Sequence, residues 1–307
     1  MFRLRIHEAK GVAFQKLFEQ LMEYDNAEFT RIKPYGSYGD RKNDGYIRSR
    51  GCFYQVYAPE NPDASRSVLD AARKADEDFQ GMLTAWQALT PVREYWFVFN
   101  DEYGGCPAPL EQTLLKIGND HNIHAGATVA KQLEDIAMSL EEDQLLDVIQ
   151  MPIPSTGFSD SIDFGILGEV IKHIQTMQVP ASRESILTAP DFSEKINFNG
   201  LSSQVSALLT VGSYQSDAVV DYFSKNSKFA RQELRNQLAA IYRDATDAFR
   251  NRMKSDGGDL IFFRMLKEIT PQAGHQGTLA ALQTAAIVVM AFYFEACDIF
   301  EDPNAVA

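Results

Sequence analysis

The chain has 307 residues and a formal net charge of −13. The length is typical of two domains, and the acidic balance excludes a protein that coats nucleic acid over its whole surface. The three cysteines, Cys52, Cys106 and Cys297, lack a CxxC pair, which argues against structural zinc and favours a reducing compartment. Because the N-terminus lacks the apolar stretch of a signal peptide, we expect a cytoplasmic protein.

The first elements are a helix and a short hairpin. Apolar residues recur at helical spacing over residues 14–22, and Glu19 lies at the edge of this apolar stripe. A loop rich in Gly and Tyr follows over residues 34–39. Beyond it we predict two strands, Asp44–Arg48 and Gly51–Tyr57, joined by a hairpin turn at residues 48–51.

The next elements alternate between helix and strand. We predict a helix over residues 64–88, capped by Asp63 or Ser65, with Leu69 among its apolar residues. A fully buried strand over 95–100, a helix over 110–119, a short strand near 122–125 and an acidic segment over 132–149 complete this part. The pattern predicts an α/β domain with a mixed sheet flanked by helices.

The second half of the chain reads as mostly α-helical. A Pro/Gly/Ser-rich linker, Met151–Gly157, precedes it, which predicts domains at residues 1–152 and 158–307. The longest apolar run, Ala285–Phe294, is half of what a bilayer crossing needs, so we expect a buried helix and no membrane. Ser182–Pro190 reads as a connector. The predicted helices cover residues 165–175, 201–209, 215–225, 230–254, 258–270 and 278–300.

The most informative residues lie in the predicted hairpin. Asp40 and Asp44 stand in a Gly-bounded turn, and Gln55 follows on the next strand. Acidic and amide oxygens in such positions can converge on Mg²⁺ for phosphodiester hydrolysis. Taken alone, Asn43-Asp44-Gly45 favours an ordinary turn over a metal site, because Asn and Gly tolerate positive φ and Asp can cap its own backbone.

The ordered set of helix acid, acidic turn and strand amide resembles the Mrr-like branch of the PD-(D/E)xK restriction-endonuclease superfamily. The resemblance covers residues 14–60 and implies a restriction-endonuclease-like domain. It implies that Asp44 and Gln55 bind Mg²⁺, that Glu19 is the acid of the first helix and that Asp40 is an accessory acid.

Tyr57 departs from this pattern, because the family has a Lys two residues after the strand ligand. A Tyr brings no positive charge, and losing the Lys should lower the rate on the order of 10²-fold or more. Lys42, Lys74 or Arg73 could supply the missing cation. The domain therefore cuts slowly, uses a displaced cation, or only binds nucleic acid.

Basic residues gather in the same part of the chain, since residues 1–57 hold ten Lys or Arg against seven Asp or Glu. A basic face near the candidate site would bind DNA through phosphate contacts. The alternative is ordinary solvated loop charge. The predicted nucleic-acid-binding residues are Arg41, Lys42, Arg48 and Arg50, with Arg31 and Lys33 near them.

A second resemblance covers more of the chain. The runs Gln55–Glu60, Phe97–Asp101, Lys195–Leu201 and Cys297–Pro303 resemble bacterial three-component ABC-ATPase conflict systems related to Lamassu defence. The resemblance implies an effector in antiphage or anti-plasmid defence, whose helical C-terminal domain docks onto an SMC/ABC-type ATPase or a middle component. It leaves a homo-oligomer open.

The remaining motifs give weaker evidence of function. His121 and His124 could ligate a metal if they lay on one helix, but a surface pair is the simpler interpretation. Asp256–Asp259 favours a helix end and the cap of the next helix over a phosphate-binding loop. Three hypotheses follow: an ATPase-driven DNA endonuclease, a non-catalytic DNA-binding or scaffolding adaptor of the same complex, and a restriction enzyme that acts alone on modified DNA.

Overall fold

The computed structural model describes residues 1–36, 39–150, 162–177, 192–225, 228–249, 257–296 and 298–303. The chain divides into an N-terminal unit, Phe2–Met151, and a C-terminal unit that begins at Pro152. The predicted linker Met151–Gly157 and the connector Ser182–Pro190 lie outside the described residues.

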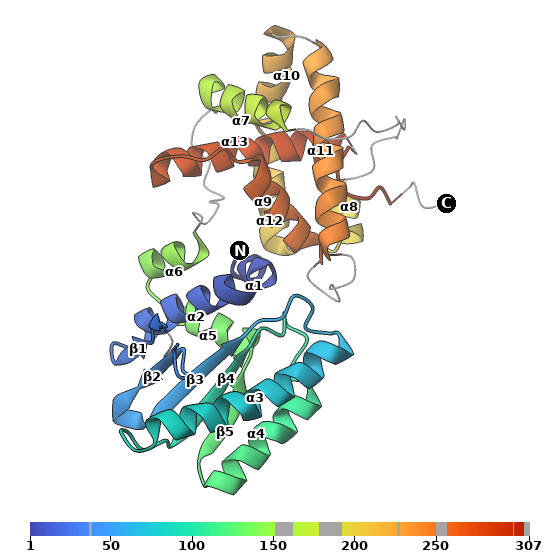
Figure 1. Ribbon diagram of the computed structural model, residues 1–307. Coiled ribbons are helices and arrows are strands. Elements are labelled where there is room, and N and C mark those ends of the chain that lie inside the picture. The colour runs from blue at the N-terminus through green and yellow to red at the C-terminus, as the bar shows by residue number, and fades with distance from the viewer. Residues whose placement is uncertain are drawn as a thin grey trace. The chain divides into compact units, whose positions relative to one another are not determined.

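The N-terminal unit contains a five-stranded mixed sheet (Figure 1). Its strands lie in the order β1-β2-β3-β4-β5, with β1, β2 and β3 antiparallel and β3, β4 and β5 parallel. The predicted α/β class is confirmed. The strands are β1 (Phe29–Arg31), β2 (Gly45–Ile47), β3 (Cys52–Tyr57), β4 (Glu94–Phe99) and β5 (His124–Thr128).

The hairpin between β2 and β3 forms where the sequence predicts it. A 3-10 turn, η2 (Arg48–Arg50), ends at Gly51, whose φ of 64° lies in the left-handed region. A Cβ atom at Gly51 would come within 2.3 Å of the carbonyl oxygen of Pro91, so glycine is required there for two reasons. This turn sets the register that pairs Ile47 with Cys52 and Gly45 with Tyr54.

Helices cover both faces of the sheet (Figure 1). Two of them, α3 (Ser65–Trp86) and α4 (Ala108–His121), pack together over one face. The helices α1 (Phe2–Glu8), α2 (Gly11–Asp25), α5 (Ala130–Ser139) and α6 (Glu142–Ile149) contact one another on the other side. The sequence missed α1 and β1, and the predicted cap of α3 is wrong, because its N-cap is Ala64 without a side-chain hydrogen bond.

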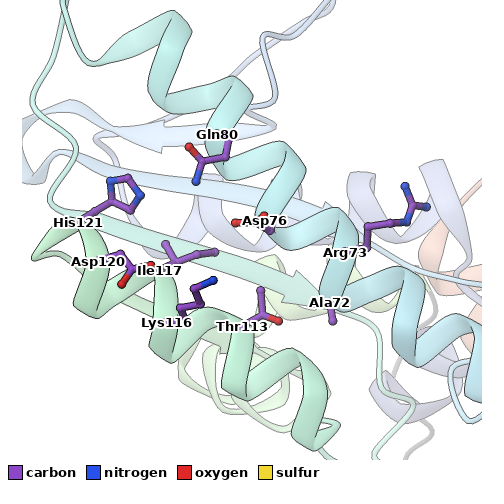
Figure 2. Close-up of a pocket in the computed structure, with 9 residues that line it drawn as sticks. All are labelled: Ala72, Arg73, Asp76, Gln80, Thr113, Lys116, Ile117, Asp120 and His121. Atoms are coloured by element: carbon purple, nitrogen blue, oxygen red, sulfur yellow. The ribbon is translucent and has the colours of Figure 1, made fainter.

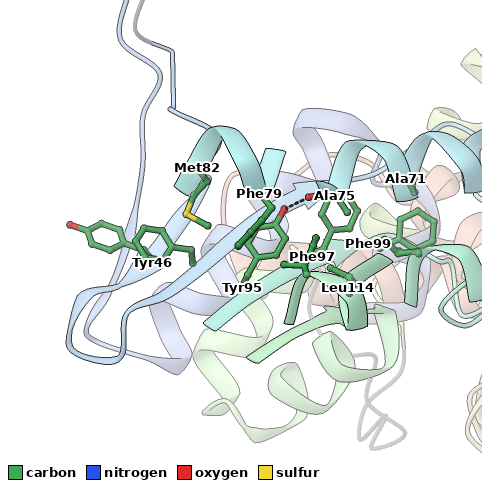
Figure 3. Packing of buried hydrophobic residues seen from close by; sticks show 12 residues of the cluster. Tyr46, Ala71, Ala75, Phe79, Met82, Tyr95, Phe97, Phe99 and Leu114 are labelled. Carbon is green, nitrogen blue, oxygen red and sulfur yellow. Dashed lines mark hydrogen bonds between the residues drawn. The ribbon is translucent and has the colours of Figure 1, made fainter. Parts of the chain in front are cut away.

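An aromatic core fills the space between the sheet and α3 (Figure 3). Tyr46, Phe53 and Tyr95 form a row across three adjacent strands, and Phe97 and Phe99 follow along β4. The small residues Ala71 and Ala75 let α3 approach these rings, and the hydroxyl of Tyr95 donates to the carbonyl oxygen of Ala75 at 3.2 Å. Burying each Phe contributes roughly 1.5–3 kcal/mol.

Leu69 corrects one detail of the prediction for α3. It was expected on the apolar face, but its side chain is 63% exposed. The buried face instead follows Ala71, Ala75, Phe79 and Met82, which recur at intervals of three or four residues.

The C-terminal unit is mostly helical, as predicted. Its α8 was missed, and α13 ends at Glu295, five residues before the predicted end at Phe300. The end of the helix predicted over 230–254 lies partly outside the described residues, as does Asp256. The helices are α7 (Phe164–Thr176), α8 (Phe192–Phe198), α9 (Ser203–Ser213), α10 (Ser216–Lys225), α11 (Lys228–Phe249), α12 (Gly257–Ile269) and α13 (Gln276–Glu295).

The apolar run of α13 is the centre of this unit. Every residue from Ala285 to Phe294 is buried, and α13 contacts α7, α9, α10 and α12. A helix that is apolar all round is stable in this position because neighbours cover every side. Within the described part of the chain, Gly277–Glu295 alone is long and apolar enough to cross a membrane, and 67% of its most apolar window is buried inside the fold.

Candidate functional site

The sheet face toward α3 carries one polar position between aromatic rows. Phe53, Gln55 and Tyr57 share this face, because side chains alternate along a strand. Asp44 directly precedes β2, and its hydrogen bonds to the backbone of Tyr54 and Val56 place it beside Gln55 of β3. Asp44 and Gln55 are only 3% and 5% exposed, so a carboxyl and an amide lie buried on neighbouring strands.

Asp44 is fastened to the backbone on both sides of Gln55. Its N–H donates to the carbonyl oxygen of Tyr54 at 3.0 Å, and its Oδ2 accepts from the N–H of Val56 at 2.7 Å. Among the described residues, no hydrogen bond reaches its Oδ1. One carboxylate oxygen thus binds the strand, while the other makes no hydrogen bond to any described residue.

Two amides beside Asp44 have buried atoms without hydrogen-bond partners in the described part of the chain: Oε1 of Gln55 and Nδ2 of Asn43. An unpaired buried polar atom costs about 1–3 kcal/mol, so it calls for an explanation such as a missing ligand. The other end of Asn43 is satisfied, because its Oδ1 accepts from the N–H of Gly45 at 3.1 Å. Asn43 therefore forms a local turn with the N–H of Gly45, but Gly45 belongs to β2, the positive φ values lie at Arg41 and Lys42, and the Asp44 carboxylate binds the backbone of β3 and not its own.

Charges around Asp44 act on its protonation. Burial raises the pKa of Asp44 from 3.8 to about 7, against the opposing effect of the Val56 N–H. The negative charges of Asp40 and Glu19 raise this pKa further, and the positive charge of Lys74 lowers it. Glu19 of α2, which accepts from the side chain of Gln15 at 2.9 Å, therefore lies within electrostatic reach of Asp44.

The residues present fit a hard divalent cation with few protein ligands. The free oxygens of Asp44 and Gln55 are of the type that Mg²⁺ prefers, and Mg²⁺ usually keeps several waters. Across the described residues, no group of three or more His, Cys, Asp or Glu side chains is placed to hold a metal ion. Asp40 and Glu19 would therefore act on a cation at Asp44 and Gln55 through their charge.

A buried ion cluster stands beside this pair. Asp78 of α3 is 1% exposed, and its two oxygens accept from Lys42 at 2.7 Å and from Lys74 at 2.5 Å. The ammonium nitrogen of Lys74 lies 6.0 Å from the ring centre of Tyr57. Sequence reasoning missed Asp78, although an acid three residues after Ala75, on the apolar stripe of α3, was a usable signal.

The same cluster fixes the loop that carries Asp44. Arg41 and Lys42 have φ values of 57° and 60°, a left-handed conformation that non-glycine residues rarely adopt. The stem of Lys42 crosses α3 at Gly81, where a Cβ atom would come within 2.9 Å of its Cγ. The indole N–H of Trp86 donates to the carbonyl oxygen of Arg41 at 3.3 Å. Helix α3 therefore holds the loop before β2.

The predicted DNA-binding residues fall into two groups. Arg41 and Lys42 lie in the loop beside Asp44. Arg48 and Arg50 lie at the opposite end of β2, in the hairpin turn, where Arg50 pairs with Glu94 at 2.7 Å and Arg48 donates to the hydroxyl of Tyr46 at 3.3 Å. The structure thus does not bring all four together around Asp44.

A polar groove between α3 and α4 contains Arg73 and His121 (Figure 2). The ring of His121 packs against Phe79 with centroids 4.8 Å apart. His124 opens β5, after Asn122 has ended α4 in the left-handed conformation, so the two histidines do not share a helix, and both are exposed, as expected for a surface pair.

Two C-terminal motifs noted in the sequence meet in the fold. Lys195 of α8 is 1% exposed and donates to the carbonyl oxygens of Phe294 and Ile299, both at 2.7 Å. The amide of Asn199 donates to the carbonyl oxygen of Glu301 and accepts from its N–H, both at 2.9 Å. These motifs therefore fasten the segment after α13 to α8; Cys297 itself lies outside the described residues.

Comparison with known proteins places the C-terminal unit. Residues 166–301 match a family model described as C-terminal domain 10 of the ABC-three component (ABC-3C) systems. Residues 166–301 are therefore similar to a domain of ABC-three-component systems, as the resemblance of Lys195–Leu201 and Cys297–Pro303 implied. No curated protein and no solved structure matches the chain. The match does not reach Asp44 or Gln55, so the nuclease resemblance of the N-terminal unit stays a prediction.

Proposed function

We propose that this chain is the effector subunit of an ABC-three-component system, and that its N-terminal unit hydrolyses DNA phosphodiesters with Mg²⁺. The observation that carries the proposal is the buried pair of Asp44 and Gln55 on neighbouring strands. Each offers an oxygen without a hydrogen bond from any described residue.

The chain's own residues would divide the work. Asp44 and Gln55 would hold the cation, which would polarise a phosphoryl oxygen and lower the pKa of a nearby water. Asp44 must be ionised for this role, and the cation replaces the proton that burial favours. Glu19 and Asp40 add negative charge nearby, which favours a divalent cation at this end of the sheet.

The family name supports protein partners, since it describes systems of several components. We propose an SMC/ABC-type ATPase and a middle component as these partners, with the helical C-terminal unit as the part that docks. The partner would control when the N-terminal unit cuts, in defence against phages or plasmids.

A second function is a non-catalytic adaptor that binds DNA or holds the complex together. Tyr57 favours it, because a half-buried tyrosine whose pKa is raised by burial stands where the resemblance places a lysine. In this alternative Asp44 and Gln55 are still buried side by side, but no positively charged side chain next to them assists hydrolysis.

The two functions give different results in a plasmid-cleavage assay with Mg²⁺ or Mn²⁺, with and without the partner ATPase. For the nuclease we expect Asp44→Ala to lower the cutting rate on the order of 10²-fold or more. A matched control is Asp135→Ala, an exposed carboxylate of the same unit, which should cut like the wild type. Absent cutting by all proteins, with the ATPase present, would favour the adaptor. Cutting of modified DNA alone, without any partner, would identify a self-sufficient restriction enzyme.

A further inference from the structure

We propose that Lys74 supplies the positive charge that Tyr57 cannot, binding a non-bridging oxygen of a DNA backbone phosphate, and that Asp78 positions it. This inference rests on the proposed function. It assigns Lys74 a direct contact with substrate and Asp78 an indirect role.

Lys74 lies beside Tyr57, at the position where the charge is missing. Tyr57 ends β3, and Lys74 reaches it from α3, with its ammonium nitrogen 6.0 Å from the Tyr57 ring centre. The positive charge of Lys74 also acts on Asp44. A cation on α3 thus stands next to the strand position where the nuclease pattern places its lysine, and on the side of the metal ligand.

Three basic residues, Lys42, Arg73 and Lys74, could replace the missing lysine, and two of them fit less well. Arg73 is among the residues that line the groove between α3 and α4 (Figure 2), and it pairs with Asp70 at 3.2 Å and Glu77 at 2.9 Å. The charge of Arg73 acts on Tyr57, but two acids of its own helix already pair with it, whereas the charge of Lys74 acts on Asp44. Lys42 lies in the loop before β2 and shares Asp78 with Lys74, and the negative charges of Asp40 and Glu77 also act on Lys42.

The two lysines that bind Asp78 outnumber its single negative charge. Asp78 neutralises one of the two lysines that it binds, so the cluster of Lys42, Asp78 and Lys74 keeps one net positive charge. The side chain of Lys74 is 31% exposed and can meet a ligand, whereas that of Asp78 is 1% exposed and cannot leave. A cation that is already held in place needs little reorganisation when a phosphate arrives, which is the condition for effective electrostatic stabilisation.

The test compares Lys74→Gln with its neighbour Arg73→Gln, which removes the same charge one residue away. We expect Lys74→Gln to lower the cutting rate on the order of 10²-fold. It should also make the association constant for DNA less dependent on salt. The magnitude of the slope of log K against log salt concentration, measured without divalent metal, should fall by about one. Arg73→Gln should change neither. Tyr57→Lys, added to Lys74→Gln, should restore cutting, which a merely structural role of Lys74 would not allow.

Asp78→Asn tests the positioning role separately. Because it frees both lysines and adds net positive charge, DNA binding should become tighter while kcat falls. Unfolding followed by tryptophan fluorescence checks that each variant is folded. Equal cutting rates and equal salt slopes for Lys74→Gln and Arg73→Gln would overturn the inference. If neither the wild type nor Asp44→Ala cuts, the proposed nuclease fails, and the salt slopes still decide whether Lys74 binds phosphate.

Discussion

The N-terminal unit should lose about 1.4 kcal/mol of its free energy of unfolding for each pH unit between pH 4 and pH 7. The cause is Asp44, whose pKa is raised from 3.8 to about 7 in the folded state, mainly by burial. In this window the folded unit keeps a proton that the unfolded chain has released. The stabilisation is thus complete below pH 4 and is lost as the pH rises through 7, for a total of up to about 4 kcal/mol.

Asp44→Asn should remove this dependence. Asparagine does not ionise, and its side-chain oxygen can still accept from the N–H of Val56. At pH 8 we therefore expect the variant to be more stable than the wild type by up to about 4 kcal/mol, although it lacks the metal-binding carboxylate.

Urea unfolding at pH 5, 6, 7 and 8 measures this effect. Both tryptophans of the chain, Trp86 and Trp96, lie in the N-terminal unit, so their fluorescence follows that unit alone. Asp135→Asn, which changes an exposed carboxylate that pairs with Lys131, is the control and should keep the wild-type slope. If the free energy of unfolding changed with pH equally in Asp44→Asn and the wild type, Asp44 would not be the group that keeps a proton in the folded state.

Lys195→Met should destabilise the C-terminal unit by about 2–4 kcal/mol. Methionine preserves the apolar stem but removes the donors to the carbonyl oxygens of Phe294 and Ile299. It also removes an ammonium group 4.5 Å from the ring centre of Phe294. The two carbonyl groups would be left buried without these bonds, and the contact of residues 298–303 with α8 would be weakened, although Asn199 would still bind Glu301.

Two signals separate this result from a general loss of stability. Thermal unfolding by far-UV circular dichroism should show an earlier transition, while the tryptophan signal of the N-terminal unit stays unchanged. Hydrogen exchange should become faster in residues 298–303. Lys225→Met, which removes an exposed lysine that lies over Phe164, is the control and should behave like the wild type. An unchanged transition in Lys195→Met would mean that water replaces the ammonium group without cost.

The sequence predicted the parts of the fold whose pattern is local. The stripe over residues 14–22 and the apolar run Ala285–Phe294 became α2 and α13 because their periodicity and length leave few alternatives. The helices α1 and α8 and the strand β1 were missed because each has seven residues or fewer. Segments of this length depend on tertiary packing more than on their own propensity.

The candidate site was predictable to a similar extent. A short hairpin brings Asp44 and Gln55 together because a tight turn fixes the strand register. The residue spacing around the turn, and so the register, can be predicted from the sequence. Asp78 could not be assigned in the same way. Its partner Lys42 lies 36 residues earlier in the chain, and only the packing of α3 on the loop brings the two into contact. Leu69 was misplaced for the related reason that the pattern of α3 allows two neighbouring apolar faces.

The central claim is that Asp44 and Gln55 together bind a divalent cation. Its most direct test is a crystal of the full chain grown with Mn²⁺ and measured at a wavelength where manganese scatters anomalously. We predict an anomalous peak within about 2.0–2.3 Å of Asp44 Oδ1 and Gln55 Oε1, absent from crystals of Asp44→Asn. A map with no peak there, or with a peak held only by other residues, would contradict the account.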